Sequence, residues 1–397
     1  MKNTRIIIAG DLFPMPCNYE LFSAGDARAL FGEKLCELFG SANLRVCNFE
    51  GCFTDSDQPV EKVGPSIKAP VSAVRAIREL GIDCATLGNT HSMDYGRQGY
   101  LDTCKTLAEN GIAYFGWGDN ADDIKRYETV ERDGRRIVLY NTTERFANNA
   151  PGKDHPGVNL YDEYRVCQEI AELKKDCDLL IVFYHGGIEG THYNSEPMRR
   201  RFHRLADCGA DVVISQHTHA VGEEERYNGA YLLYGQGNFC FHFRPDVTPL
   251  LAEGLVLELE LSDSGFTAKP HRILRTEKGC VYDEAQELSE FYERSKTHDK
   301  LLAGDEEAQA QFGEHFGKDC LNWVNTFFYC FRGINPLDAQ KRKELAPAEY
   351  REYMRSAYTR EQLLGMQMFL QNEEFNEVGN TILSELLRET DTKENLS

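Results

Sequence analysis

Short runs of apolar, mostly β-branched residues recur along the first two thirds of the chain, and each is bounded by a glycine, asparagine or histidine. Runs that are apolar at nearly every position are typical of strands with both faces buried. The predicted strands are Arg5–Ala9, Leu44–Asn48, Asp83–Leu87, Arg136–Tyr140, Leu179–Tyr184, Asp211–Ser215 and Ala230–Tyr234. Leu255–Leu261 instead alternates Leu or Val with Glu, which predicts a half-exposed strand.

Between several of these runs, apolar residues recur at helical spacing. The segments with this pattern are Val71–Leu80, Leu101–Asn110, Tyr164–Lys175 and Met198–Cys208. Strands that alternate with helices form a sheet covered by layers of helix. We therefore predict an α/β domain over residues 1–275. Three consecutive arginines, Arg199 to Arg201, open the last of these helices, and we expect them to face solvent.

The composition of the sequence changes after Gly279, where Glu, Lys, Arg, Gln and Leu dominate. Apolar residues recur at helical spacing from Leu288 to Leu387. This pattern predicts a mostly helical C-terminal extension over residues 276–397. The extension holds an aromatic-rich stretch from Trp323 to Phe331, which we interpret as core or as a docking surface for a protein partner.

Charge and cysteine content narrow the class of protein. The 397 residues include 44 basic and 64 acidic side chains, a net charge of −20 that disfavours nucleic acid and anionic membrane surfaces as partners. Thirteen cysteines without a C-x-x-C pair suit reduced thiols better than a disulfide framework. The apolar run at residues 6–9 is too short for a signal-peptide core. We expect a cytoplasmic protein without membrane insertion.

Five of the apolar runs are followed by side chains that bind metals or move protons. These side chains are Asp11 after the first run, Asn48 and Glu50 after the second, Asn89, His91 and Asp94 after the third, His185 and Glu189 after the fifth, and His217 and His219 after the sixth. Open α/β sheets place their ligand sites beyond the carboxyl ends of the strands, so we expect these residues to meet. Carboxylate, carboxamide and imidazole together suit Mn, Fe, Zn or Co, whereas Mg and Ca prefer oxygen alone.

The order of these residues resembles that of calcineurin-like metallophosphoesterases. More closely, it is similar to the bacterial capsule-synthesis CapA family, whose members are linked to poly-γ-glutamate production. The resemblance covers about residues 5–245 and rests on Gly10-Asp11, Asn48 and Glu50, Gly88-Asn89, His91, Asp94 and Gly96, His185 and Glu189, His217 and His219, and Gly237-Asn238-Phe239. It implies a layered α/β/β/α sandwich of the metallophosphoesterase type.

The resemblance also implies roles for individual residues. One metal would be held by Asp11, Glu50 and His219, and a second by Asn89, His185 and His217, with Glu50 as the bridging carboxylate. The other predicted site residues are His91 as proton donor to a leaving group, Asp94 and Glu189 as partners that orient the imidazoles, and Asn48, Lys68 and Asn238 as substrate contacts. The chain departs from the phosphoesterase pattern at Phe13, where the larger family has a histidine, so either one or two ions are expected.

Three functions follow as hypotheses. The first is a metal-dependent hydrolase that activates water against a phosphoester or a related small anionic substrate. The second is hydrolysis or transfer at a γ-glutamyl amide, which the capsule resemblance suggests. The third is a non-catalytic, metal-containing assembly protein that docks a partner through its C-terminal helices. One scaffold hosts many reactions, so the sequence alone leaves the three open.

Overall fold

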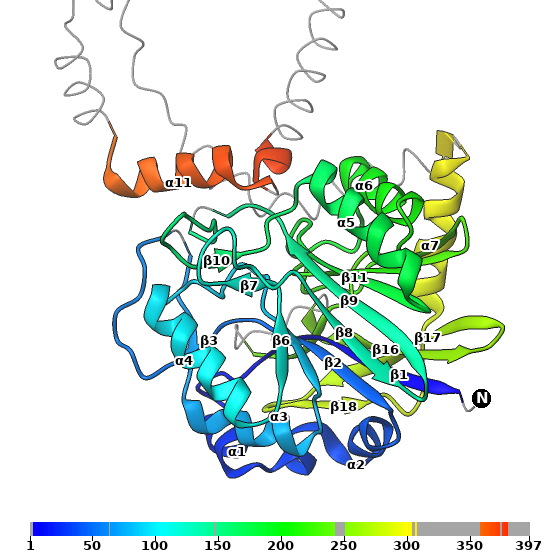
Figure 1. Cartoon of the computed structure of the whole chain (residues 1–397), viewed down its shortest axis with the longest axis horizontal. Coiled ribbons are helices and arrows are strands. Elements are labelled where there is room, and N and C mark those ends of the chain that lie inside the picture. Colours follow the sequence, from blue (N-terminus) through cyan, green and yellow to red (C-terminus); the bar gives the residue numbers. More distant parts are fainter. Residues whose placement is uncertain are drawn as a thin grey trace, which may run out of the picture.

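The chain folds into four layers, helix on sheet on sheet on helix (Figure 1). The computed structural model describes residues 3–62, 64–146, 148–242, 251–303, 306–307, 358–373 and 375–379. The predicted α/β/β/α sandwich is thereby confirmed.

The first sheet has eight strands. Its order is β18-β17-β16-β1-β2-β5-β6, and β15 pairs with the end of β1. The strands are β1 (Thr4–Phe13), β2 (Leu44–Phe49), β5 (Cys84–Thr86), β6 (Ala113–Phe115), β15 (Asn238–Phe241), β16 (Glu253–Ser262), β17 (Gly265–Arg275) and β18 (Cys280–Tyr282). β1, β2, β5, β6 and β15 run parallel, so their carboxyl ends lie along one edge.

The second sheet has six strands in the order β13-β14-β12-β11-β9-β8. They are β8 (Tyr127–Arg132), β9 (Arg135–Thr143), β11 (Leu179–His185), β12 (Val212–Gln216), β13 (Glu224–Tyr227) and β14 (Ala230–Leu233). Loop segments form two small two-stranded sheets. In one, β3 (Cys52–Phe53) pairs with β4 (Lys68–Ala69), and in the other, β7 (Trp117–Gly118) pairs with β10 (Gly157–Val158).

Helices cover the outer face of each sheet. The first sheet carries α1 (Tyr19–Ala24), α2 (Ala27–Gly40), α3 (Val74–Glu79), which follows a 3-10 turn at Val71–Ala73, and α4 (Gly96–Glu109). The second carries α5 (Glu163–Leu173), continued by a 3-10 turn at Lys174–Asp176, and α6 (Glu196–Asp207). Two further helices later in the chain are α7 (Ser289–Leu302) and α11 (Arg360–Gln371).

The apolar runs are explained by the two faces they bury. In β1, Ile6 and Ile8 pack between the sheets, whereas Ile7 and Ala9 pack under the first helical layer. Side chains of a strand alternate between its faces, so a strand buried on both must be apolar throughout. β16 follows the predicted alternation, with its leucines inside and Glu260 exposed.

The first sheet extends beyond the predicted domain boundary at residue 275, because β18 pairs with β17. Helix α7 also packs on β13, where the Glu224 amide donates to Ser295 Oγ at 2.9 Å. The division into residues 1–275 and 276–397 stays a prediction, and the aromatic stretch from Trp323 to Phe331 lies outside the described residues. Among the residues that the structure describes, no helix is long and apolar enough to cross a membrane.

Candidate metal centre

The predicted site residues converge where the carboxyl ends of both sheets face each other. Asp11, Asn48 and Glu50 come from the ends of β1 and β2 in the first sheet. From the second sheet, His185 ends β11, and the turn after β12 carries His217 and His219. Asp11 and His217 are 206 residues apart in sequence, yet the His217 amide donates to Asp11 Oδ2 at 3.1 Å.

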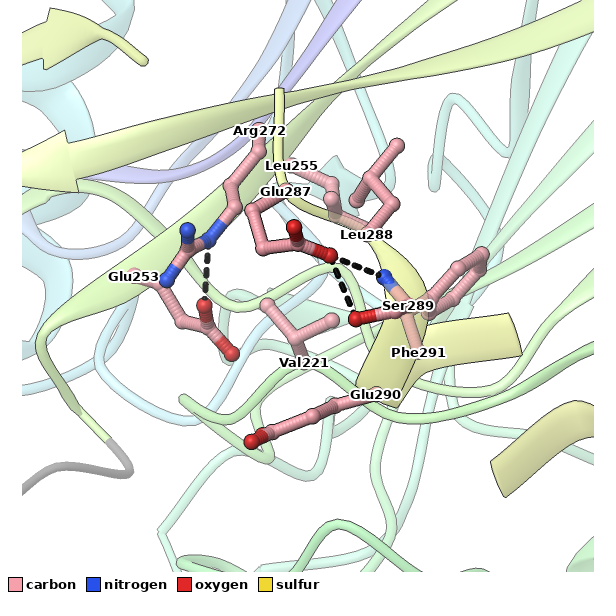
Figure 2. A pocket seen from close by; sticks show the side chains of 9 residues that line it. All are labelled: Val221, Glu253, Leu255, Arg272, Glu287, Leu288, Ser289, Glu290 and Phe291. Carbon is pink, nitrogen blue, oxygen red and sulfur yellow. Dashed lines mark hydrogen bonds and ion pairs between the residues drawn. The ribbon is translucent and has the colours of Figure 1, made fainter. Parts of the chain in front are cut away.

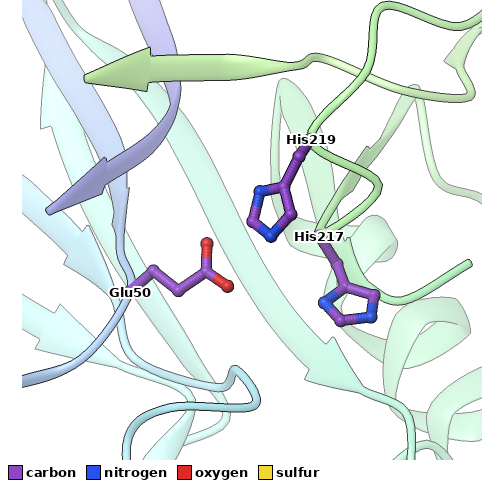
Figure 3. A group of neighbouring side chains, drawn as sticks. All are labelled: Glu50, His217 and His219. Atoms are coloured by element: carbon purple, nitrogen blue, oxygen red, sulfur yellow. The ribbon is translucent and has the colours of Figure 1, made fainter. Parts of the chain in front are cut away.

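Three of these side chains form a compact donor set. One ligand atom each from Glu50, His217 and His219 lies within 4.8 Å of the other two. In Figure 3 the Glu50 carboxylate points from its loop toward the two imidazoles on the opposite turn. Glu50 is 0% exposed, and neither of its oxygens has a hydrogen-bond partner among the described residues. One basic group close to it is His185 Nε2, 3.6 Å from Oε1.

Burial and neighbouring charges shift the pKa values of the ionisable groups in this cluster. Burial, and next the charge of Asp11, raise the pKa of Glu50 well above its ordinary value. Burial lowers the pKa of His185 well below its ordinary value, and the neighbouring imidazoles lower it further. At His219 burial also acts to lower the pKa, but Glu50 and Asp11 outweigh it and raise the pKa to about 10. A buried carboxylate without a hydrogen bond is costly, and a divalent cation is the group that this donor set fits.

The turn that carries both histidines is strained. His217 and His219 have φ angles of 99° and 57°, in the left-handed region that residues with a side chain rarely adopt. Such strain persists where surrounding contacts hold the backbone, often at functional sites. Here the Ser215 hydroxyl donates to Gly186 O at 2.9 Å and ties this turn to the loop after His185.

Two asparagines join the first-sheet ligands. Asn48 Nδ2 donates to Asp11 Oδ1 at 2.8 Å and lies 3.4 Å from His185 Nδ1. Asn89 donates from Nδ2 to Asn48 Oδ1 at 3.1 Å, and its own amide oxygen accepts from the His91 amide at 3.1 Å and the Ser92 hydroxyl at 2.8 Å. Asn89 therefore holds the loop that presents His91, and its role as a metal ligand stays a prediction.

His91 and Asp94 form a dyad, and Lys62 contacts both of its members. His91 Nδ1 lies 2.7 Å from Asp94 Oδ2, and Asp94 also accepts a hydrogen bond from the Ile67 amide at 2.9 Å. Lys62 contacts both members, pairing with Asp94 Oδ1 and lying 3.3 Å from His91 Nδ1. Burial, and next the charge of Lys62, lower the pKa of His91. The sequence analysis missed Lys62 because it stands in a polar loop without any periodic pattern.

The remaining predicted residues differ in their distance from the cluster. Asn238 Oδ1 lies 2.9 Å from His219 Nδ1, and Glu189 Oε1 lies 3.9 Å from His217 Nε2. Lys68 instead donates to Ser56 O and to Asp57 Oδ1, both at 2.6 Å, so its amine faces an exposed loop. Its role in substrate binding stays a prediction.

Phe13 fills the position at which the larger family has a histidine. Its ring centroid lies 5.2 Å from that of Phe49 and 6.4 Å from that of Phe241, and the side chain is fully buried. Gly51 makes room for this ring, since a Cβ there would lie 2.3 Å from a ring carbon. Phe13 thus forms an apolar wall behind Asp11 and supplies no ligand.

The expectation of solvent-facing arginines on α6 is wrong for two of the three. The Arg199 side chain is 5% exposed and that of Arg201 is 18% exposed, whereas that of Arg200 is 70% exposed. Successive residues of a helix point in different directions, and the two buried arginines turn toward the protein.

A separate hollow lies between β16, β17 and the start of α7 (Figure 2). Arg272 Nε donates to Glu253 at 2.7 Å within it, and the Ser289 amide donates to Glu287 at 2.9 Å. These groups are satisfied by each other, and none of the predicted site residues lines this hollow.

Comparisons with known proteins find a family and relatives that match part of the chain. Residues 5–242 match the family model of the bacterial capsule synthesis protein PGA_cap. The chain is 29% identical over 183 residues to the capsule biosynthesis protein CapA of Bacillus anthracis, and 29% identical over 171 residues to the PGA biosynthesis protein CapA of Bacillus subtilis. These alignments cover 44% and 43% of this chain, and 44% and 45% of the relatives, so the chain spans less than half the length of either.

Similar solved structures are more remote. One is a hypothetical protein from Thermus thermophilus, with 14% identity and a TM-score of 0.44 over 69% of this chain and 100% of that one. Another is the NAD nucleotidase of Haemophilus influenzae, with 15% identity and a TM-score of 0.41 over 78% of this chain and 60% of that one. Likenesses at this level support no conclusion about activity.

Proposed function

Because the chain belongs to the bacterial capsule synthesis family PGA_cap, we propose that it is a metal-dependent hydrolase acting on a phosphoester or a related small anionic substrate. The observation that carries the proposal is the buried Glu50 carboxylate, which faces His217 and His219 and lacks a hydrogen-bond partner among the described residues. A carboxylate placed in this way is stabilised when a cation completes its surroundings.

The residues that would hold the cation are Asp11, Glu50, His185, His217 and His219, and their mixed oxygen and nitrogen donors suit Mn, Fe, Zn or Co. When bound, such an ion supplies Lewis acidity and lowers the pKa of water at the site. Asp11 is already fixed in place by three contacts, from Asn48 Nδ2, from the His217 amide and from His219 Nδ1 at 3.2 Å.

His91 is the residue placed to move a proton. Asp94 contacts Nδ1 of its ring, so Nε2 is the nitrogen that exchanges a proton with a leaving group or with water. Asp94 is in turn held by Lys62 and by the Ile67 amide, which fixes the orientation of the imidazole. A general acid or base works best when its geometry is set before the substrate arrives.

The proposal is tested by counting metal ions first and by assaying turnover second. Elemental analysis of protein purified without chelator is expected to find one or two transition-metal ions per chain. With Mn added, the native protein is expected to hydrolyse members of a panel of phosphomonoesters and phosphodiesters, whereas His185→Ala loses at least a hundredfold in kcat/KM. The exposed His155 provides the matched control, since His155→Ala should leave turnover unchanged. The proposal is refuted if elemental analysis finds no metal in the purified protein, or if native and His185→Ala protein have equal turnover.

A second candidate acts on γ-glutamyl amides. It is favoured by the similarity to proteins named for capsule and PGA biosynthesis. The same donor set would serve attack on an amide carbon, with His91 delivering a proton to the leaving amine. Chain-length analysis of poly-γ-glutamate after incubation separates the two candidates, because only this one shortens the polymer.

The third candidate is a non-catalytic assembly role in capsule polymer synthesis, in which the C-terminal helical region docks a protein partner. Protein that binds metal but turns over neither phosphoesters nor γ-glutamyl amides would favour it.

A further inference from the structure

Within the part of the chain that the structure describes, the side chains of the candidate metal centre are almost completely buried, and a rim of more exposed side chains adjoins them. The side chains of Asp11, Glu50, His185 and His217 are each at most 1% exposed. The site residues with more exposure are Lys62 at 10%, His91 at 14%, His219 at 14% and Glu189 at 31%. Among the described residues, these exposures favour an approach to the donor set between the loop that carries Lys62 and His91 and the loops that carry Glu189 and His219.

Helix α11 and the residues after it pack on one side of this rim. They form an apolar cluster with two residues of the site loops, and its buried members are Phe146, Ile188, Met368, Phe369, Phe375 and Val378. Ile188 directly precedes Glu189. The Phe146 ring stands edge-on to the imidazole of His217, with centroids 5.2 Å apart. The C-terminal segment thus supports the residues that touch the donor set.

Ionic contacts continue this connection beneath α11. Arg201 Nη2 lies 2.7 Å from Glu373, and its Nη1 lies 3.3 Å from Glu144 Oε1. Glu144 Oε1 also accepts from the Gly187 amide at 3.1 Å, and the Glu144 amide donates to His185 O at 3.0 Å. A short chain of contacts therefore runs from the C-terminal segment to the loop that follows a predicted ligand.

The other end of α11 reaches the opposite side of the rim. Arg360, the first residue of the helix, pairs with Glu61, which immediately precedes Lys62. Twelve helical residues span roughly 18 Å, and α11 contacts Glu61 at its first residue and the apolar cluster through its later turns. Both members of this pair are more than half exposed, so it contributes little energy and the apolar cluster holds the helix in place. Figure 1 shows α11 along the upper edge of the molecule in this view.

We propose that residues 358–373 and 375–379 act as a specificity element, a fixed roof that spans both sides of the rim and admits small anions and free chain ends but excludes the interior of a polymer. The inference rests on the proposed function, because it concerns access to the same metal centre. The family match ends at residue 242, so this roof lies outside the part of the chain that the family model covers.

Detaching the roof tests the proposal. Phe369 is 2% exposed at the centre of the apolar cluster, and Phe369→Asp should release the segment. Its neighbour Leu370 is 68% exposed, so Leu370→Asp is the matched control on the same helix. Arg360→Glu breaks the contact at the other end without touching the core, and adding Glu61→Arg restores an ion pair of opposite polarity.

Two readouts are compared in the full chain loaded with Mn. The first is removal of Mn by free EDTA and by EDTA linked to dextran. The second is the ratio of kcat/KM for a phosphodiester inside a polyethylene glycol chain to that for p-nitrophenyl phosphate. Phe369→Asp is expected to raise both the rate of Mn removal by dextran-linked EDTA and the kcat/KM ratio at least tenfold. Arg360→Glu is expected to raise both quantities at least threefold, and the double variant Arg360→Glu, Glu61→Arg should return them toward the native values. Leu370→Asp should match the native protein.

The outcomes separate the two proposals. Protein that binds no Mn refutes the proposed function, and the roof with it. The roof alone is refuted if the protein binds Mn but neither Arg360→Glu nor folded Phe369→Asp changes the dextran-EDTA rate or the substrate ratio. If Phe369→Asp does not fold, Phe369→Ala, which removes the same ring without burying a charge, decides the question.

Discussion

Replacing Glu50 by glutamine should make the metal-free protein more stable than the native protein. In the presence of metal the same replacement should make it less stable than the native protein. In metal-free protein both carboxylate oxygens are buried without a hydrogen-bond partner among the described residues. A buried polar atom left unsatisfied costs about 1–3 kcal/mol, and more when charged. An amide of the same shape leaves its polar atoms equally unsatisfied but removes the buried charge, so metal-free Glu50→Gln should be more stable than metal-free native protein by about 1 kcal/mol.

Metal should invert that order. A ligand at one hundred times its Kd stabilises the folded state by about 2.7 kcal/mol. Unfolding entropy is about 2.1 cal/mol/K per residue, so for 397 residues this stabilisation corresponds to a rise in Tm of about 3 °C in the native protein. Glu50→Gln should gain little, because an amide is a much weaker ligand than a carboxylate for these ions.

The measurement is thermal unfolding at pH 7.5 in chelator and in excess Mn, for native protein, Glu50→Gln and the exposed control Glu260→Gln. The control should behave as native protein in both conditions. An equal Mn-induced rise in Tm for native protein and Glu50→Gln would remove Glu50 from the ligand set. A metal-free Glu50→Gln that is less stable than native protein would show that the buried carboxylate is satisfied in some other way.

The other predictions concern neighbouring and distant groups. Lys62→Met should lower kcat at least tenfold without loss of bound metal, because Lys62 holds the dyad at His91, whereas Lys68→Met should change kcat less than twofold in the same steady-state assay. Burial alone would lower the pKa of His298, but two flanking glutamates raise it from 6.5 to about 9, so its contribution to stability is complete below pH 6.5 and is lost as the pH rises through 9. Urea unfolding should therefore show native protein and His298→Gln differing more at pH 6 than at pH 9.5. Gly116→Ala should cost more than about 2 kcal/mol, because its Cβ would lie 1.9 Å from a buried amide oxygen, whereas Gly111→Ala meets nothing within 4 Å and should cost only the strain of its positive φ, about 1 kcal/mol by chemical denaturation.

The sequence by itself determined the layers of the fold. Uninterrupted apolar runs such as Leu179–Tyr184 can be satisfied only when both faces of a strand are buried, and the alternation in Leu255–Leu261 marks a face that meets water. It also indicated which residues stand at strand ends, since polar groups such as Asp11 and His185 directly follow the apolar positions. These signals are local, because they depend on the period of the backbone and on burial.

Tertiary structure alone decided which of these groups meet and what surrounds them. Contacts between Asp11 and His217, or between Arg360 and Glu61, join segments hundreds of residues apart, and no local period encodes such pairings. Lys62 became part of the site only because its loop folds back onto Asp94. The surroundings of a buried carboxylate, and the place of a distant helix, depend on packing in three dimensions, which is why the sequence could indicate candidate ligands but not the helix that packs against their loops.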